Sequence, residues 1–422
     1  MYPDLWRDAA NPAPFMNSQD TAPRPGGRRA SCASCTHCGF CLAQLPDLPP
    51  ARRRARQPAR PHLPGQATAR GRGADARQTH LDRCLTCRAC ETTCPSGVEY
   101  GRLADLGREL VEERVAARPD ASGRAARPAA RACCRDRRLF ATLLRWGGPS
   151  RPLVPRVLHR HHVPRGRPPA WPQTPRLRRR CAASCCSRAA CSRPWCPRSM
   201  PTPARVLTEL GIEVVRVPAG GCCGAIDQHL GYPERARARM RHNLDAWQPA
   251  LDAGADAIVI NATGCGAQVA EYAHALADDP DYAERAQRAT ELATDPVELL
   301  EPYAERLRPA DGVPRRIAFH APCTLQHGLG LSGRTEALLR RIGFELTLVG
   351  DPHICCGSAG TYSVLQPGLA RELRDDKVRQ LERGGPQLIA TANVGCLTHI
   401  QNGTRRPVRH WLELVTATPA QG

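Results

Sequence analysis

Helix-like and strand-like patterns of apolar residues alternate along the second half of the chain, from residue 203 onward. Segments with helical spacing are followed by short runs of β-branched and apolar residues, and Gly211 would end the first helix. This alternation predicts α/β units with parallel strands. The predicted helices are 203–210, 233–247, 335–342 and 367–381, and the predicted strands are 213–217, 257–260, 317–320, 345–349 and 388–392.

The predicted elements form an internal repeat marked by cysteines. A pair, Cys222-Cys223, is followed by a helix, a strand and then Cys265, 42 residues after Cys223. The pair Cys355-Cys356 is followed by the same elements and by Cys396, 40 residues after Cys356. Such a repeat predicts two half-domains whose cysteines lie at the carboxyl ends of strands, where open parallel sheets bind ligands.

Paired cysteines flanked by glycine favour a metal cluster or a thiol redox site, because glycine lets the backbone approach a ligand closely. The alternative is a chance pairing of small buried cysteines, which the recurrence in register disfavours. The candidates are Cys222, Cys223 and Cys265 in the first half, and Cys323, Cys355, Cys356 and Cys396 in the second.

The two halves differ in their upstream cysteine. Cys323 precedes Cys355 by 32 residues. The same distance before Cys222 gives Ala190, next to Cys191. Cys191 lies in a segment of aberrant composition, so the first half has no secure upstream partner.

The N-terminal part carries a different cysteine motif. Cys84, Cys87, Cys90 and Cys94-Pro95 have the spacing C-x2-C-x2-C-x3-C-P. In two-cluster ferredoxins the first three thiolates of such a motif bind one [4Fe-4S] cluster and the fourth binds the other. A zinc ribbon would instead need two separated C-x2-C pairs. The motif therefore predicts single-electron transfer.

An upstream motif, Cys35, Cys38 and Cys41, has the same spacing but has Leu45 in the fourth position. With the crossover pattern, these three cysteines would bind a cluster together with Cys94. The cluster of the downstream motif would then lack one thiolate, for which Cys32 is a substitute candidate.

The 22 cysteines and the formal charge of +20 must be explained together. The N-terminal segment has no apolar core typical of a signal peptide, and no apolar run reaches about 18 residues. We therefore expect reduced, metal-binding cysteines, a cytoplasmic location or a peripheral one on the inner face of the cell membrane, and no transmembrane segment.

The positive charge is confined to two stretches. Asp47 to Asp75 and Asp136 to Glu209 enclose 23 arginines and no acidic residue, so the rest of the chain sums to about −3. Residues 48–74 and 124–201 are rich in Arg, Pro and Ala, the second segment also in Cys, and both show little periodicity. Three interpretations compete. The segments could form a basic tail that binds nucleic acid, they could be flexible linkers, or they could result from translation of a GC-rich gene in the wrong reading frame. The abrupt boundaries favour the third reading, and no nucleic-acid partner is predicted.

Other candidate residues have a weaker basis. The loop Gly357–Thr361 could hold a phosphate, but it lacks the lysine of a P-loop. We expect the four histidines near the cysteine loops to orient ligands by hydrogen bonds more often than to bind metal. They are His320, His327, His353 and His399.

These motifs together resemble the iron–sulfur subunit family of bacterial glycolate oxidase (glycolate dehydrogenase). The similarity covers about 35–46, 79–123 and 203–415. Leu45, the spacer after it and residues 124–201 depart from the pattern, and Cys191-Ser-Arg-Pro194 lies near the position of the family's first Cys-x-x-Pro. The matching runs begin at Cys35, His80, Cys90, Gly221, Cys323, His353, Asn393 and Arg409.

The resemblance implies an α-helical two-cluster ferredoxin domain followed by tandem α/β half-domains of the CCG (cysteine-rich) type. It implies two [4Fe-4S] clusters, the second incomplete at Leu45, and a further iron–sulfur cluster or thiol centre in the CCG domains. Flavin-binding partner subunits would oxidise glycolate to glyoxylate, and this chain would pass the electrons toward a membrane quinone. The expected domains are 30–123 with an insert at 48–74, an aberrant disordered or mistranslated segment 124–201, and half-domains 202–300 and 301–415.

Three alternatives stay open at this point. The chain could serve a lactate, glycerol-3-phosphate or heterodisulfide oxidoreductase, which share this layout. It could be a basic metalloprotein that binds nucleic acid, in which case its affinity would fall steeply with salt. It could also be a defective, frameshifted product with one cluster unstable or absent.

Overall fold

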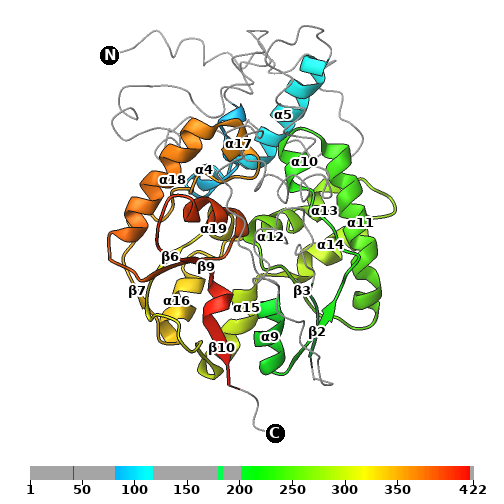
Figure 1. Ribbon diagram of the computed structural model, residues 1–422. Coiled ribbons are helices and arrows are strands. Elements are labelled where there is room, and N and C mark those ends of the chain that lie inside the picture. The colour runs from blue at the N-terminus through cyan, green and yellow to red at the C-terminus, as the bar shows by residue number, and fades with distance from the viewer. Residues whose placement is uncertain (1–40, 42–80, 117–178, 184–200, 419–422) are drawn as a thin grey trace, which may run out of the picture.

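The computed structural model describes residues 41, 81–116, 179–183 and 201–418. Near the N-terminus these residues form helices α4 (Ala89–Thr92) and α5 (Tyr100–Ala116). Both helices lie at one end of the molecule, near α17 (Tyr362–Leu365) and α10 (Ala225–His229) (Figure 1). This end carries the cysteines of the motif at residues 84–94.

The first half-domain contains a parallel sheet with the strand order β2-β1-β3-β4. Its strands are β1 (Arg179–Ala183), β2 (Ile212–Arg216), β3 (Ile258–Val259) and β4 (Ala293–Thr294). The helices around it are α9 (Pro201–Glu209), α10, α11 (Pro233–Asp252), α12 (Thr263–Val269), α13 (Tyr272–Ala275) and α14 (Ala283–Leu292).

The second half-domain contains a parallel sheet with the order β7-β6-β8-β9. Its strands are β6 (Arg316–His320), β7 (Glu345–Leu346), β8 (Leu388–Thr391) and β9 (Val408–His410). Its helices are η8 (Thr324–Gly328), α16 (Arg334–Arg341), α17, α18 (Pro367–Glu382) and α19 (Val394–Gln401).

The two sheets match strand by strand. Arg180 of β1 pairs with Glu213, and Arg316 of β6 pairs with Glu345. On the other side, Ala182 pairs with Ile258, and Ala318 pairs with Ile389. Strand β1 therefore occupies in the first sheet the place that β6 occupies in the second.

A connecting layer joins the halves around a shared core. It comprises α15 (Pro296–Leu300), η7 (Glu301–Arg306), η9 (Trp411–Leu414) and the antiparallel pair β5 (Leu307–Pro309) and β10 (Val415–Ala417). One continuous apolar cluster includes Val214 and Val259 from the first sheet and Ile317 and Leu388 from the second. Because both sheets bury side chains in the same core, the halves are held together as one body.

The cysteine-bearing ends of the two halves also meet. Thr263 Oγ1 lies 2.8 Å from Thr324 Oγ1, and Thr263 N donates to Ala392 O. A Cβ on Gly264 would lie 3.6 Å from Asn393 Oδ1, so α12 and the start of α19 are close neighbours. In Figure 1 these two helices face each other in the middle of the molecule.

The predicted elements of the second half of the chain are confirmed with small shifts. The helix predicted at 233–247 continues to Asp252, whereas the strands predicted at 257–260 and 345–349 shrink to two residues each. The antiparallel pair β5–β10 and strands β4 and β9 were not predicted, since each has only two or three residues.

Strand β1 corrects one expectation. It lies inside segment 124–201, which we expected to be disordered or mistranslated, and before the predicted domain start at residue 202. Its sequence, Arg-Arg-Cys-Ala-Ala, has little strand character. The parallel neighbours β2 and β3 supply the hydrogen-bonding edges for it, so tertiary pairing outweighs local propensity.

Candidate metal centre

The loop at residues 84–94 is shaped to bring its cysteines together. Thr86 and Arg88 adopt positive φ angles of 52° and 60°, which non-glycine residues seldom do. Thr86 N donates to Cys84 Sγ at 3.4 Å, and α4 begins directly after Arg88. Such strain clusters at functional sites and persists only where the surrounding structure imposes it.

A buried arginine imposes this conformation. The Arg108 guanidinium on α5 donates to Leu81 O at 3.2 Å, to Cys84 O at 2.9 Å and to Thr86 Oγ1 at 3.0 Å. Asp105, which also accepts from Arg108, contacts His229 Nδ1 at 3.0 Å. Although burial opposes it, His229 and Arg108 hold the pKa of the Asp105 carboxyl below its usual value. The loop is thus braced against the first half-domain.

The thiols of this loop are desolvated and close to other sulfurs. Burial raises the pKa of the Cys87 thiol well above its usual value, and a negative charge on Cys323 would raise it further. Burial also raises the pKa of Cys90, with smaller contributions from Cys84 and Cys41. Buried thiols stay protonated unless a cation replaces the proton, which is what a bound metal does.

In the second half-domain four thiols form a chain. Cys323 Sγ donates to Cys355 Sγ at 3.9 Å, and Cys355 and Cys356 in turn share a hydrogen bond. Cys356 is hydrogen-bonded to Cys396, whose sulfur accepts from Asn393 Nδ2 at 3.5 Å. A hydrogen bond to Cys355 raises the pKa of Cys323 well above its usual value, and desolvation adds to the rise.

The glycine after each cysteine pair permits this arrangement. Gly357 has φ +85°, and a Cβ there would lie 2.7 Å from Ala370 O on α18. Gly224 has φ +92°, and a Cβ there would lie 3.0 Å from Ala236 O on α11. In both halves the cysteine loop therefore crosses the following helix too closely for any side chain.

Two basic residues stand beside the second cysteine site. His320, at the end of β6, is 2% exposed, and one of its ring nitrogens lies within 4.8 Å of Cys356 Sγ and Cys396 Sγ. Lys377 on α18 is 1% exposed and donates from Nζ to Asp351 O at 2.7 Å. Desolvation and the nearby Lys377 lower the pKa of His320 well below its usual value, so the ring is neutral.

The first half-domain arranges its cysteine pair differently. A hydrogen bond from Cys223 and the positive charge of Arg239 outweigh burial and lower the pKa of Cys222 to about 6. Arg239 forms an ion pair with Asp227. Asn243 on α11 accepts from Gly221 N at 2.7 Å and donates to Cys222 O at 2.9 Å, holding the loop in place.

The ferredoxin-type loop lies directly against the second cysteine site. Cys87 and Cys323 pack with Leu85 and Cys355 in one cluster, and charges on Cys87 and Cys355 would interact. Beside it, Thr92 Oγ1 lies 2.9 Å from His327 Nδ1. Arg88 and Arg102 pair with Glu271 of the first half-domain at 2.8 and 3.1 Å, which anchors the other side of the loop.

The donor sets fit a soft transition metal. Thiolate sulfur, with neutral imidazole as a further donor, suits iron–sulfur centres and zinc. At the second site the sulfurs are buried or half-buried and mutually hydrogen-bonded, and a buried imidazole nitrogen, His320 Nε2, has no hydrogen-bond partner within the described residues. A metal would satisfy these groups together.

The structure brings together only some of the predicted ligands. Cys84, Cys87 and Cys90 share one loop, Cys41 lies close enough to Cys90 for charge interaction, and Cys323, Cys355, Cys356 and Cys396 form one chain. Cys222, Cys223 and Cys265 belong to the first half, where Cys223 lies in the core and Cys265 packs against it. Cys94 is half-buried. Cys32, Cys35, Cys38, Leu45 and Cys191 lie outside the described residues, so the crossover pattern stays a prediction.

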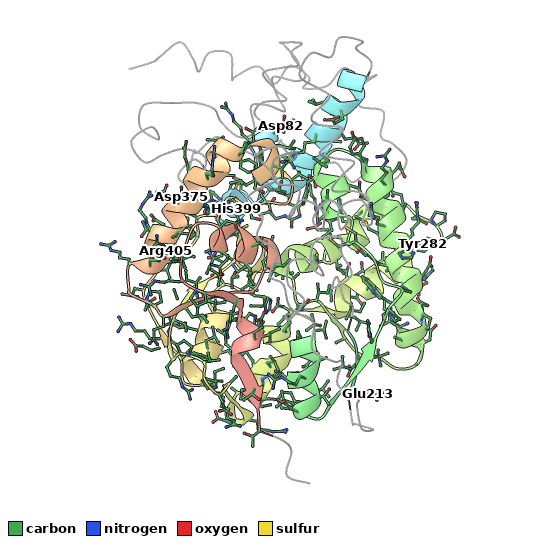
Figure 2. All side chains as sticks on the ribbon, in the orientation of Figure 1. Asp82, Glu213, Tyr282, Asp375, His399 and Arg405 are labelled. Atoms are coloured by element: carbon green, nitrogen blue, oxygen red, sulfur yellow. The ribbon has the colours of Figure 1, made fainter. Side chains whose placement is uncertain are left out.

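The histidines have distinct surroundings. His399, labelled in Figure 2, lies on α19, and its Nε2 lies 3.0 Å from Ala370 O on α18. His327 contacts Thr92, whereas His320 faces sulfur atoms. Sequence reasoning missed Arg239, Asn243 and Lys377. The sequence does show that a helix follows each cysteine pair, so residues of these helices were candidates. Only the packing shows which of their side chains point toward the cysteines.

Comparisons with known proteins agree with this architecture. Residues 34–99 match the family described as 4Fe-4S dicluster domain, and residues 182–270 and 317–401 match the family described as cysteine-rich domain. The cysteine-rich family thus matches each of the two half-domains separately. The first of these matches begins within β1. The N-terminal match spans both cysteine motifs.

Whole-chain relatives extend the similarity. The glycolate oxidase iron–sulfur subunit of Escherichia coli (strain K12) is 46% identical over 80% of this chain and 82% of its own length. The probable glycolate oxidase iron–sulfur subunit of Bacillus subtilis (strain 168) is 28% identical over 77% of this chain and 78% of its own. Lactate utilization protein A of Geobacillus thermodenitrificans (strain NG80-2) is 31% identical over 46% of this chain and 80% of its own.

Proposed function

This chain belongs to the family of glycolate oxidase iron–sulfur subunits, and on that premise we propose that it relays electrons from glycolate oxidation through its cysteine-bound centres. Flavin-binding partner subunits would oxidise glycolate to glyoxylate. Electrons would leave toward a membrane quinone. Within the described residues no helix is both long and apolar enough to cross a membrane.

We assign the ligands from the sequence motifs. Cys35, Cys38 and Cys41 with Cys94 would bind one [4Fe-4S] cluster of an α-helical ferredoxin domain. Cys84, Cys87 and Cys90 would bind the second, which lacks a thiolate at position 45. Such clusters accept and release single electrons.

The single observation that carries the relay is the packing of Cys87 and Cys323 against one cluster that contains Cys355. It joins the ferredoxin-type loop to the four-thiol chain of the second half-domain with no intervening layer of protein. Electron transfer between centres needs short separations, and the strained, arginine-braced loop keeps this one short. The second cysteine site is therefore the proposed receiver or donor next to the ferredoxin domain.

The surrounding residues would set the direction of transfer. Reduction potentials respond to net charge, to hydrogen bonds to sulfur and to solvent access. Asn393 donates to Cys396 Sγ, and the buried Lys377 lies near Cys355 and Cys356. Desolvation lowers the pKa of its ammonium group, and negative charge on Cys356 and Cys355 opposes that fall and favours the charged form. Both features favour the more negative, reduced state of a centre at the second site.

The test uses the full chain, purified anaerobically alone and with its flavin-binding partners. We expect iron and acid-labile sulfide in the isolated chain, and EPR signals that develop when glycolate is added to the complex. Lactate and glycerol 3-phosphate are added in parallel experiments, because they are the substrates expected for the related oxidoreductases. Zinc in place of iron, or signals that develop with lactate and not with glycolate, would reject the proposal as stated.

A matched variant tests the proposed route. Cys87→Ser should abolish the signal of its own cluster and slow the reduction of the second-half centre by glycolate. Thr92→Ala, at the same contact surface, should remove the hydrogen bonds to His327 and to Ala89 O but no cysteine ligand. If Cys87→Ser leaves the reduction of the second-half centre unchanged, electrons reach that centre by another route.

A further inference from the structure

His320 stands at the end of β6, beside two cysteines of the second half-domain. A ring nitrogen of His320, Cys356 Sγ and Cys396 Sγ all lie within 4.8 Å of one another. All three side chains are buried, with exposures of 2%, 1% and 3%. Three donors of metal-binding type therefore converge at one point: His320 from the end of β6, Cys356 from the loop before α17, and Cys396 from the first turn of α19.

The histidine also has an unmet polar atom. His320 Nε2 is buried and has no hydrogen-bond partner in the part of the chain that the structure describes. Two other buried histidines of this half, His410 and His399, do have partners for the same atom, whereas Nε2 of the half-buried His327 also has none among the described residues. His410 Nε2 lies 2.9 Å from Asn261 O, and His399 Nε2 lies 3.0 Å from Ala370 O. Because buried polar atoms are seldom left unpaired, the unpaired nitrogen indicates that a ligand belongs there.

We propose that His320 is a metal ligand, and that its imidazole and the thiolates of Cys356 and Cys396 bind one transition-metal ion in the second half-domain. This rests on the proposed function, and it adds a nitrogen donor to a site whose expected ligands were all cysteines. Binding releases the two thiol protons to solvent, while the neutral imidazole contributes its lone pair.

Two metal sources share this chemistry. The ion is either one iron of a cluster that also uses Cys323 and Cys355, or a single zinc ion. Mixed imidazole and thiolate sites are known for both metals. Metal analysis distinguishes them. Either metal satisfies the proposed ligation, but zinc, which has no redox chemistry, would reject the part of this site in the electron relay.

The backbone supports a ligand role for this residue. Strand β6 pairs with β8 through His320 and Thr391, so the end of β6 is held by regular hydrogen bonds. Cys396 follows β8 at the start of α19, and Asn393 donates to its sulfur. A site on strand ends and a helix start is more rigid than one on a free loop.

The experiment compares full-length variants that differ in the donor. His320→Ala removes the nitrogen, and His320→Cys supplies a thiolate in its place. His410→Ala is the matched control, because His410 is also 2% exposed and ends strand β9 of the same sheet. Iron, zinc and sulfide per chain are measured after anaerobic purification, with circular dichroism to verify folding.

We expect His320→Ala to bind the second-half metal at least about tenfold more weakly, His320→Cys to retain it, and His410→Ala to match the wild type. If the metal is iron, the reduced wild-type chain should show nitrogen hyperfine coupling in pulsed EPR, and both His320 variants should lose it. If His320→Ala fails to fold, the nitrogen coupling in the wild-type spectrum and the metal content of His320→Cys still test whether His320 is a ligand.

Each outcome bears on a different statement. The ligation is overturned if folded His320→Ala keeps its full metal content, and if the nitrogen coupling is either unchanged in that variant or already absent from the wild type. The electron relay would then still stand. A wild-type chain with neither iron nor zinc in this half overturns both. Loss of metal from His410→Ala to the same degree would mean that the effect is structural, and would also overturn the ligation.

Discussion

The two half-domains share a framework but differ in the charges around their cysteines. In each, a Cys-Cys-Gly run crosses the following helix at an alanine, Ala236 in the first half and Ala370 in the second. Seven residues later that helix presents Asn243 in the first half and Lys377 in the second. The repeat thus preserves the backbone crossing, while the side chain that braces the loop has changed from a neutral amide to an ammonium group.

At another pair of equivalent positions, 239 and 373, the charged residue is in the first half and the neutral residue is in the second. Here the first half has Arg239, paired with Asp227, and the second half has Leu373 in the apolar cluster around Cys355. The pKa of Cys222 is lowered to about 6, whereas the pKa of Cys355 lies well above its usual value. Within the described residues, each half has a cation beside its cysteines, at a different place. Thiol hydrogen bonds contribute to the difference in pKa, since one from Cys223 lowers the pKa of Cys222. A hydrogen bond with Cys323 lowers the pKa of Cys355, but one with Cys356, together with desolvation, raises it by more.

The largest expected effect comes from removing one thiol of each pair. Cys356→Ser breaks the chain of four thiols, and we expect at least about 100-fold weaker metal binding in the second half, since loss of a mere outer-shell partner already costs 10–100-fold. Cys223→Ser, the equivalent change in the first half, should leave the second-half metal in place. Metal retained against a chelator, measured by mass spectrometry, checks both. Equal losses in the two variants would mean that the halves share one centre.

The glycines test the shared framework. Gly357→Ala should lower the free energy of unfolding by about 3 kcal/mol, because it combines a positive φ with a clash against Ala370 O. Gly224→Ala should cost about 2 kcal/mol, since its nearest contact is longer. Gly330→Ala is the control, with φ +70° and open space around it, and should cost about 1 kcal/mol.

Chemical denaturation of the three glycine variants gives these values. If Gly330→Ala proves as damaging as Gly357→Ala, the backbone angle alone matters and the crossing of loop and helix is not a constraint. If Gly224→Ala is tolerated while Gly357→Ala is not, the two frameworks are less alike than their geometry indicates.

Lys377 should affect the reduction potential of the second site. Lys377→Gln removes a buried positive charge near Cys355 and Cys356. At an effective dielectric constant of about 20, a unit charge about 6–8 Å away contributes roughly 2–3 kcal/mol, or roughly 90–130 mV for a one-electron step. The potential should fall, because adding an electron loses a favourable attraction. Arg371→Gln, an exposed charge change on the same helix, is the control in an EPR redox titration.

The helices, strands and repeat could be predicted from the sequence more fully than the contacts around the cysteines. Spacing alone predicted the repeat, because a glycine-flanked cysteine pair, a helix, a strand and a single cysteine recur at nearly equal distances. It also predicted β6 and α18 almost to the residue. Helical periodicity is readable wherever one face packs on the core, as α18 does with Ala370, Leu373 and Leu381.

What escaped prediction depends on contacts between distant segments. Strand β1 has no strand signal of its own and exists through its pairing with β2 and β3. His320 and Cys396 are 76 positions apart, so their proximity follows from the pairing of β6 with β8. Likewise the contact of Cys87 with Cys323 requires the ferredoxin-type loop to dock on the second half-domain, which no local pattern encodes.

The smallest expected effect concerns the thiol of Cys222 in the metal-free chain. Its pKa of about 6 depends on a hydrogen bond from Cys223, on Gly224 N and on the positive charge of Arg239, against burial and the charge of Asp227. Arg239→Leu copies the second half, where Leu373 stands, and leaves Asp227 unopposed. We expect the pKa to rise by about one unit or more, since one unit corresponds to about 1.4 kcal/mol.

Alkylation by iodoacetamide measures this shift, because only the thiolate reacts. In the wild type, modification of Cys222 followed by mass spectrometry should increase as the pH rises through about 6, and in Arg239→Leu the increase should move to higher pH. Arg237→Leu, which breaks an ion pair with Glu234 on the same helix, is the control. An unchanged profile would assign the low pKa to the hydrogen bond from Cys223. The two halves would then differ in the direction of their thiol hydrogen bonds and not in the placement of their cations.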